Sequence, residues 1–114
     1  MKPPHLAPYT QAGDLFYLSG QLPFDQTGKI ISDDLGEQTM QTLRNIEGLL
    51  ATMGLSRNDI VKTTIWLVPG TDFATFNDRY ADFFGDHKPA RSTVFSQLAL
   101  PTAKIEIEVI AHRS

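Results

Sequence analysis

The sequence contains no cysteine in its 114 residues. Its absence excludes disulfide bonds, thiolate catalysis and thiolate metal sites, and it fits a reducing compartment. Histidine is scarce as well, because His5, His87 and His112 are too far apart in the chain to form a local metal-binding motif. We therefore expect no metal site.

Concentrated positive charge is also missing. Ten basic residues stand against 13 acidic ones, and the formal net charge is −3. Nucleic acids and anionic membranes bind through clustered positive charge, so the sequence argues against both as partners, although this argument does not extend to a small anionic ligand. No run approaches the roughly 20 apolar residues of a membrane span, and the start MKPPHLAP lacks the apolar segment of a signal peptide. We expect a cytoplasmic protein.

The composition that remains is that of a globular protein, with 41% hydrophobic and 20% charged residues. No internal repeat or low-complexity tract interrupts it. The length fits one folding unit with a real core, so residues 1–114 are predicted to form a single domain.

Hydrophobic periodicity predicts two helices. The first covers residues 35–53, because Asp34 and Glu37 have the spacing of a capping box and Gly54 is suited to end a helix. The second follows Pro69 and Gly70 and ends at Gly85. Its predicted buried stripe is aromatic and consists of Phe73, Phe76, Tyr80 and Phe83.

About six strands are expected beside these helices, giving an α+β domain. They are a short edge strand within residues 1–14, then 15–21, 29–32, 60–68, 92–95 and 104–112. Two helices cover only one face of such a sheet, yet the strand at 60–68 is apolar on both faces. This predicts that the other face meets another subunit.

The last strand places two carboxylates on one face. Strict alternation puts Ile105, Ile107 and Val109 on one side and Glu106 and Glu108 on the other. We expect Glu108 to face solvent and Glu106 to lie at a subunit interface.

Arg91 stands out within the stretch HKPARSTV, residues 87–94. Pro89 stiffens the backbone before it, and a planar guanidinium matches a carboxylate through two parallel hydrogen bonds. Arg91 therefore either reads a carboxylate ligand or pairs with a neighbouring Asp or Glu to fix the strand end. Its position alone favours the second interpretation.

The fragments PYTQA, LSGQLP, EQT, DIVKTTIWL, DFATFNDRYADFF, KPARSTV and KIEIEVIA occur in this order along nearly the whole chain. In order and spacing the chain resembles the RidA family, the YjgF-like imine and enamine deaminases. The resemblance implies a fold similar to trimeric chorismate mutase, with sheets in a central barrel-like core and three sites between subunits of a homotrimer.

For function, the resemblance implies hydrolysis of reactive 2-imino acids, or their enamine tautomers, to 2-oxo acids and ammonia without a cofactor. Arg91 would bind the substrate carboxylate, Glu106 would engage the attacking water, and Tyr9 would close the site. Nearby Arg91 would favour the charged form of Glu106. The remaining positions implied for substrate binding are Ser19, Gly20, Asn77 and Thr93.

Some positions depart from the family pattern. Only seven residues precede Pro8, Ala7 replaces a usual glycine, Thr93 replaces a frequent cysteine, and Phe95 replaces a common glutamate. Phe95 makes the pocket wall or strand face more apolar.

Three other functions stay open. One is a non-catalytic trimer that binds carboxylate metabolites or other proteins, in which Arg91 binds a carboxylate ligand and no reaction follows. The fold alone also allows chorismate mutase activity, although the motifs do not favour it. A ribonuclease is the weakest alternative, because the chain lacks a basic patch.

Overall fold

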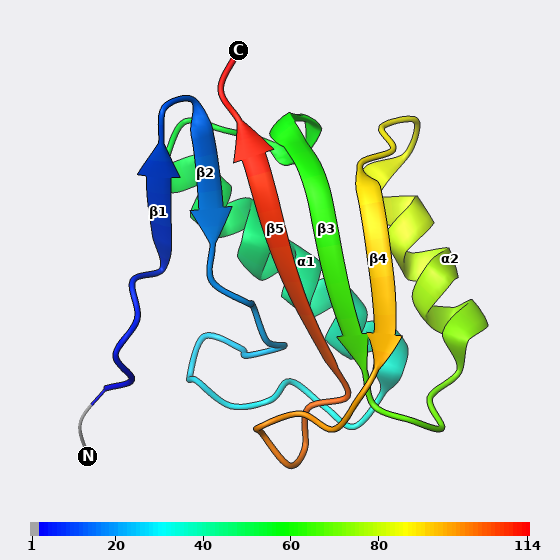
Figure 1. The fold of residues 1–114 in the computed structure, drawn as a ribbon. Coiled ribbons are helices and arrows are strands. Elements are labelled where there is room, and N and C mark those ends of the chain that lie inside the picture. Colours follow the sequence, from blue (N-terminus) through cyan, green and yellow to red (C-terminus); the bar gives the residue numbers. More distant parts are fainter. Residues whose placement is uncertain (1–2) are drawn as a thin grey trace.

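The computed structural model describes residues 3–114 as an α+β fold with two helices packed on one face of a mixed sheet (Figure 1). The strands lie in the order β1-β2-β5-β3-β4. The elements along the chain are β1 (Tyr9–Ala12), β2 (Leu15–Leu18), α1 (Leu35–Thr52), a short 3₁₀ turn (Arg57–Asp59), β3 (Ile60–Leu67), α2 (Phe73–Phe84), β4 (Ala90–Phe95) and β5 (Ile105–His112). None of the helices within residues 3–114 is long and apolar enough to cross a membrane.

The sheet is antiparallel except at one edge. β3 and β4 run parallel, since α2 carries the chain back to the starting end of the sheet before β4 begins. β1 and β4 form the two edges. The predicted short edge strand near the N-terminus is confirmed as β1.

Both helices begin and end close to the predicted positions. The Asp34 side chain accepts a hydrogen bond from the backbone N–H of Glu37 at 2.8 Å, which caps α1. Gly85 ends α2 with a φ of +60°. The aromatic stripe of α2 is buried at Phe76, but Phe73 is 40% exposed, so its predicted burial is wrong. As the first residue of α2, Phe73 lies at the edge of the core.

The part of the chain that the structure describes has five strands, and the predicted strand at 29–32 is wrong. Ile30 forms only an isolated bridge with Phe24. The segment between β2 and α1 is held instead by two side chains of α1. Asn45 donates to the carbonyls of Leu22 and Phe24, and Gln38 donates to the carbonyl of Ser32. These bonds satisfy loop carbonyls that a strand partner would otherwise satisfy.

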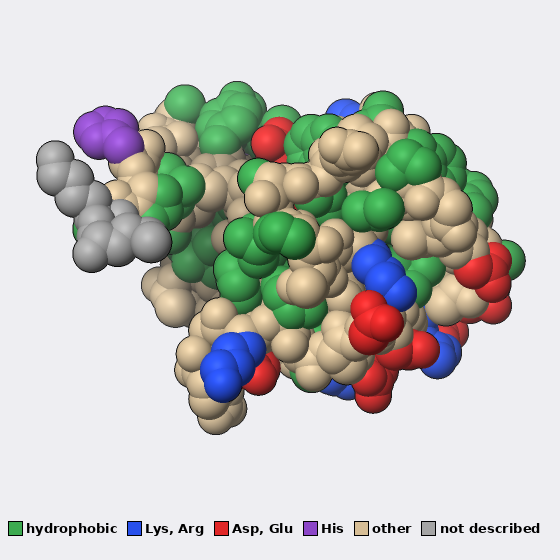
Figure 2. Space-filling view, turned by 90° about the horizontal axis from the view of Figure 1, so that it is seen from below, with side chains coloured by type: hydrophobic (Ala, Val, Ile, Leu, Met, Phe, Trp, Pro, Cys, Tyr) green, Lys and Arg blue, Asp and Glu red, His purple; other side chains and the backbone are tan. Residues whose placement is uncertain are grey.

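The two faces of the sheet differ in cover. The helix face, which carries Phe16, Leu18, Ile65, Ile107 and Val109, is buried under α1 and α2. The opposite, open face carries Tyr17, Lys62, Thr64, Trp66, Val94, Glu106, Glu108 and Ile110. Figure 2 shows hydrophobic side chains spread over the upper part of that view, where the open face lies, and most charged ones in its lower part. The prediction that the strand at 60–68 is apolar on both faces is wrong for the open face, where Lys62 and Thr64 accompany Trp66.

Candidate functional site

Glu106 lies on the open face, where β5 pairs with β3 and Glu106 stands opposite Trp66. Next to it, the backbones of Gln21 and Ile107 exchange two hydrogen bonds of 2.8 and 3.0 Å. These bonds hold Gly20 against β5, and a Cβ built on Gly20 would overlap the Oε2 atom of Glu106. The carboxylate therefore occupies the space left by the missing side chain of Gly20.

No cation of the described chain, residues 3–114, neutralises the Glu106 carboxylate. Within residues 3–114 it forms no ion pair, and the pKa of Glu106 is raised above its ordinary value of 4.5. Burial is the main cause, and the negative charge of Glu108 is the second. The side chain lines a hollow of about 230 Å³ together with Trp66, Ser96, Gln97, Leu98 and Ala99. Such a carboxylate is well suited to accept a proton.

Arg91 lies on the helix face, at the β4 edge. It pairs in the sheet with Thr63, which is buried and shares a hydrogen bond of 2.7 Å with Tyr80 of α2. The Arg91 guanidinium carbon is 5.0 Å from the ring centroid of Tyr80 and 5.3 Å from that of Phe76. These contacts leave donors of the guanidinium available at the surface.

No Asp or Glu among residues 3–114 forms an ion pair with Arg91. The interpretation that Arg91 fixes the strand end through such a pair is therefore wrong. Arg91 instead lines a mainly apolar hollow of about 260 Å³ with residues of α2 and the following turn, among them Tyr80, Phe84, His87 and Pro89. A cation without an acidic partner beside an apolar hollow matches a carboxylate ligand.

One chain does not bring Arg91 and Glu106 together. Thr63 pairs with both Arg91 and Val109, so these residues share the helix face, whereas Glu106 lies three positions from Val109 and points to the open face. The two side chains also line separate hollows. Within one chain, Arg91 is accordingly not among the groups that change the pKa of Glu106, and the expected shift toward the charged form is absent.

The other predicted residues are spread over the sheet. Tyr9 is on β1, at the edge opposite β4, with its ring 6.2 Å from that of Phe16. Ser19 donates a hydrogen bond of 2.6 Å to the carbonyl of Ala7 and so holds the segment that leads into β1. Asn77 is half-buried on α2.

Thr93 lies two positions after Arg91 on the same face of β4. Its hydroxyl oxygen is buried and has no hydrogen-bond partner within residues 3–114. An unsatisfied buried hydroxyl costs about 1–3 kcal/mol, so a ligand at Arg91 that supplied a partner would gain from it.

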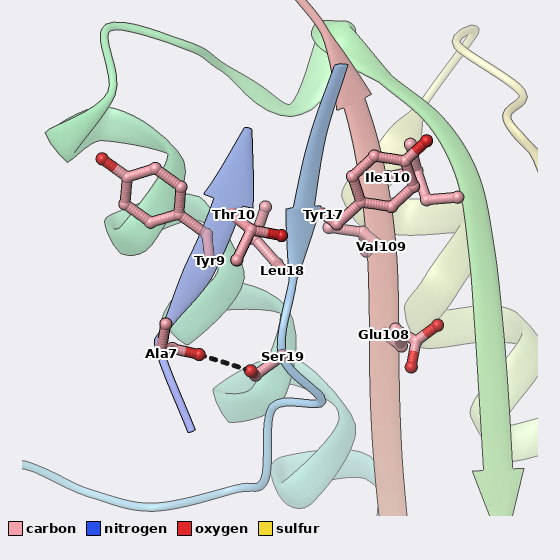
Figure 3. A pocket seen from close by; sticks show the side chains of 9 residues that line it. All are labelled: Ala7, Tyr9, Thr10, Tyr17, Leu18, Ser19, Glu108, Val109 and Ile110. Carbon is pink, nitrogen blue, oxygen red and sulfur yellow. Dashed lines mark hydrogen bonds between the residues drawn. The ribbon is translucent and has the colours of Figure 1, made fainter. Parts of the chain in front are cut away.

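A further hollow of about 300 Å³ opens near the β1 edge (Figure 3). Tyr17 and Glu108 line it, together with Ser19 and Ile110, while the Tyr9 ring points away from Glu108. Neither this hollow nor the place of Trp66 opposite Glu106 was predicted. Both depend on which strands are neighbours, and the periodicity of one strand carries no signal for that.

Comparison with known proteins agrees with this architecture. The sequence model of the family described as Endoribonuclease L-PSP matches residues 2–113. A RutC family protein of Pyrococcus horikoshii is 41% identical, over 97% of this chain and 91% of its own length. A protein of Salmonella typhimurium named 2-iminobutanoate/2-iminopropanoate deaminase is 38% identical, over 97% of this chain and 91% of its own length.

A solved structure is similar over the whole chain. The crystal structure of Escherichia coli TdcF with bound serine matches with a TM-score of 0.88 and 36% identity, covering 100% of this chain and 91% of TdcF. From the match to residues 2–113 and the similarity to these relatives, we conclude that this chain belongs to the RidA (YjgF-like) family, whose sequence model is described as Endoribonuclease L-PSP.

Proposed function

We propose that this protein hydrolyses reactive 2-imino acids, and their enamine tautomers, to 2-oxo acids and ammonia at a site between subunits of a homotrimer. The observation that carries the proposal is a pair of uncompensated charges, the Arg91 guanidinium and the half-buried Glu106 carboxylate. The name of the Salmonella relative and the serine bound to TdcF support a small substrate with a carboxylate.

The placement of the two charges supports a site built from two copies. Arg91 is on the helix face at one edge, and Glu106 is on the open face, so a second copy has to bring its β4 edge to the open face of the first. The open face has apolar residues to receive it, including Tyr17 and Val94, which are 41% and 44% exposed. Contact between two different surfaces closes into a ring when the rotation between copies permits closure, and the family resemblance favours three copies.

The reaction needs one anchor and one base. Arg91 holds the carboxylate of the imino acid and thereby fixes the imine carbon relative to Glu106 of the neighbouring copy. Glu106 takes a proton from water as the water oxygen bonds to the imine carbon, and it passes this proton to the imine nitrogen, which gives an amino alcohol and frees the carboxylate. Glu106 then takes the proton of the new hydroxyl as the C–N bond breaks and transfers it to the departing nitrogen, which yields the 2-oxo acid and ammonia.

The remaining predicted residues would support this geometry. Thr93 offers its hydroxyl beside Arg91, and Gly20 leaves room for the Glu106 carboxylate. Ser19 is engaged with Ala7, so we assign it to the shape of the site. Tyr9 and Asn77 would approach the substrate from the edges of the copies, with Tyr9 closing the site.

A trapping assay tests the proposed activity. An amino-acid oxidase generates 2-iminobutanoate or 2-iminopropanoate in the assay, and semicarbazide traps whatever imine survives. The protein is expected to suppress semicarbazone formation in proportion to its concentration. No suppression with either imine would contradict the proposed reaction for these substrates and would favour a trimer that only binds carboxylate metabolites.

Replacing Gly20 with alanine is expected to reduce kcat/KM about a hundredfold, because the added Cβ overlaps Glu106 Oε2 and displaces the base by about 1 Å. Gly48→Ala is the matched control, since a Cβ at Gly48 of α1 meets no atom within 4 Å. The trapping assay gives the rates, and circular dichroism verifies folding. A folded Gly20→Ala protein with full activity would show that the position of Glu106 is not important.

The ribonuclease named in the family description is not favoured for this chain. The formal net charge is −3, and the cation of the candidate site lies among aromatic rings instead of in a basic patch. RNA binding that weakens with salt would argue for that activity.

A further inference from the structure

Two large aromatic side chains are exposed side by side near Arg91. Phe73, the first residue of α2, is 40% exposed, and Phe95, the last residue of β4, is 51% exposed. Their ring centroids are 6.0 Å apart, so they form one apolar surface, which we call the Phe73–Phe95 pair. Neither ring contributes to the buried core, and neither is needed for the proposed reaction.

This pair extends directly from the proposed carboxylate anchor. The Arg91 guanidinium carbon lies 5.9 Å from the ring centroid of Phe73. Along β4, Arg91, Thr93 and Phe95 occupy alternate positions and therefore share one face. The face thus carries a cation, then a threonine whose buried hydroxyl has no hydrogen-bond partner within residues 3–114, then an exposed aromatic ring.

The charges around the pair restrict what it can receive. No acidic side chain within residues 3–114 neutralises Arg91, so an occupant that carries a carboxylate is favoured there. Beyond Arg91, the Phe73–Phe95 pair itself offers aromatic surface, and a polar or charged substituent placed on it would lose its water without gaining a partner from either ring. The occupant that matches both parts is a carboxylate with an apolar side chain.

We infer that the Phe73–Phe95 pair is the side-chain subsite of the site, and that it makes the protein prefer 2-imino acids with branched or aromatic side chains over those with one or two carbons. This inference rests on the proposed function. A ligand held at Arg91 places its α-substituent over Phe73, and a longer substituent extends along β4 toward Phe95. Methyl and ethyl groups leave most of the pair in contact with water.

The test compares two imines in the trapping assay, with an oxidase supplying the imine of leucine or that of alanine. Wild-type kcat/KM is expected to be at least about tenfold higher for the leucine-derived imine, since apolar pockets discriminate by about 10- to 200-fold. Phe95→Ala is expected to bring the ratio of the two kcat/KM values near one while activity on the alanine-derived imine is retained. Phe95→Leu is expected to keep most of the preference for the leucine-derived imine. Ile31→Ala is the control, because Ile31 is an exposed apolar residue in a different hollow.

Binding measurements separate this inference from the proposed reaction. Calorimetry with 4-methyl-2-oxopentanoate and with pyruvate, the corresponding products, is expected to show the same order of affinity, and this readout requires no turnover. If neither imine is hydrolysed, the proposed reaction fails while the binding ratio still tests the subsite. Equal affinities, or a ratio unaffected by Phe95→Ala, would overturn the subsite. A Phe95→Ala protein with reduced mass by light scattering and equal losses on both imines would assign the pair to a subunit contact and also overturn it.

Discussion

Replacing Arg91 with alanine is expected to reduce kcat/KM for 2-iminobutanoate by about a hundredfold or more. The guanidinium has no acidic partner within residues 3–114, so its hydrogen bonds are available to the substrate carboxylate. Removing one member of such a desolvated charged pair costs about 2–5 kcal/mol. Arg91→Lys keeps the charge but loses the planar fork, so it is expected to raise KM and to retain more activity than alanine.

Arg44→Ala is the matched control for this effect, because Arg44 is an exposed arginine on α1, away from β4. Rates come from semicarbazide trapping over a range of imine concentrations. An Arg91→Ala protein as active as Arg44→Ala would contradict the role of Arg91 as the anchor.

Glu106→Gln is expected to reduce kcat by about 10²–10⁴-fold, the usual contribution of a general base, while binding of a 2-oxo acid is retained. Glutamine keeps the size of the side chain, so the space over Gly20 stays filled. Glu108→Gln is the control, since Glu108 is exposed and affects Glu106 only through its charge. If Glu106→Gln turned over normally, another group would have to be the base.

The same substitution has an effect on stability whose sign follows from the pKa. Burial and Glu108 raise the pKa of Glu106 in the folded chain, so its contribution to stability is complete below the unfolded pKa and is lost as pH rises through the folded pKa. Glutamine carries no such loss. Glu106→Gln is therefore expected to stabilise the fold at neutral pH. Because Arg91 of a neighbouring copy would oppose the raised pKa of Glu106, this gain in stability is clearest in an Arg91→Ala background.

In that background, Glu106→Gln is expected to raise the Tm at about pH 7, and the gain is expected to shrink toward about pH 4, near the unfolded pKa of glutamate. Thermal melts at both pH values measure it. A lower Tm at neutral pH would show that the ionised carboxylate stabilises the fold.

Local patterns were sufficient to predict both helices. The capping position of Asp34 and the positive φ of Gly85 are set by the chain itself, and the structure has both. The alternation of residues 105–112 likewise predicted the buried and exposed faces of β5. The strand at 29–32 failed because side chains of α1 hold the loop between β2 and α1. Asn45 donates to the carbonyls of Leu22 and Phe24, and Gln38 donates to that of Ser32.

For the candidate site, the sequence indicated a close approach at one residue but not the arrangement of the residues. The lack of a side chain at Gly20 indicated a close approach, and the register with β5 identifies Glu106 as the group that approaches. That Arg91 and Glu106 point to opposite faces depends on the parallel pairing of β4 with β3, since a shift of one residue would reverse the face. No periodicity within one strand specifies that register.

The central claim is that Arg91 of one copy and Glu106 of another form each site, and mixing two inactive variants tests it most directly. Arg91→Ala and Glu106→Gln proteins are unfolded together, refolded as mixed assemblies and tested by imine trapping against each variant refolded alone. Random mixing in a ring pairs an intact Arg91 with an intact Glu106 at about one quarter of the sites, so about a quarter of wild-type activity is predicted. Mixed assemblies as inactive as the two parents would contradict a site shared between copies.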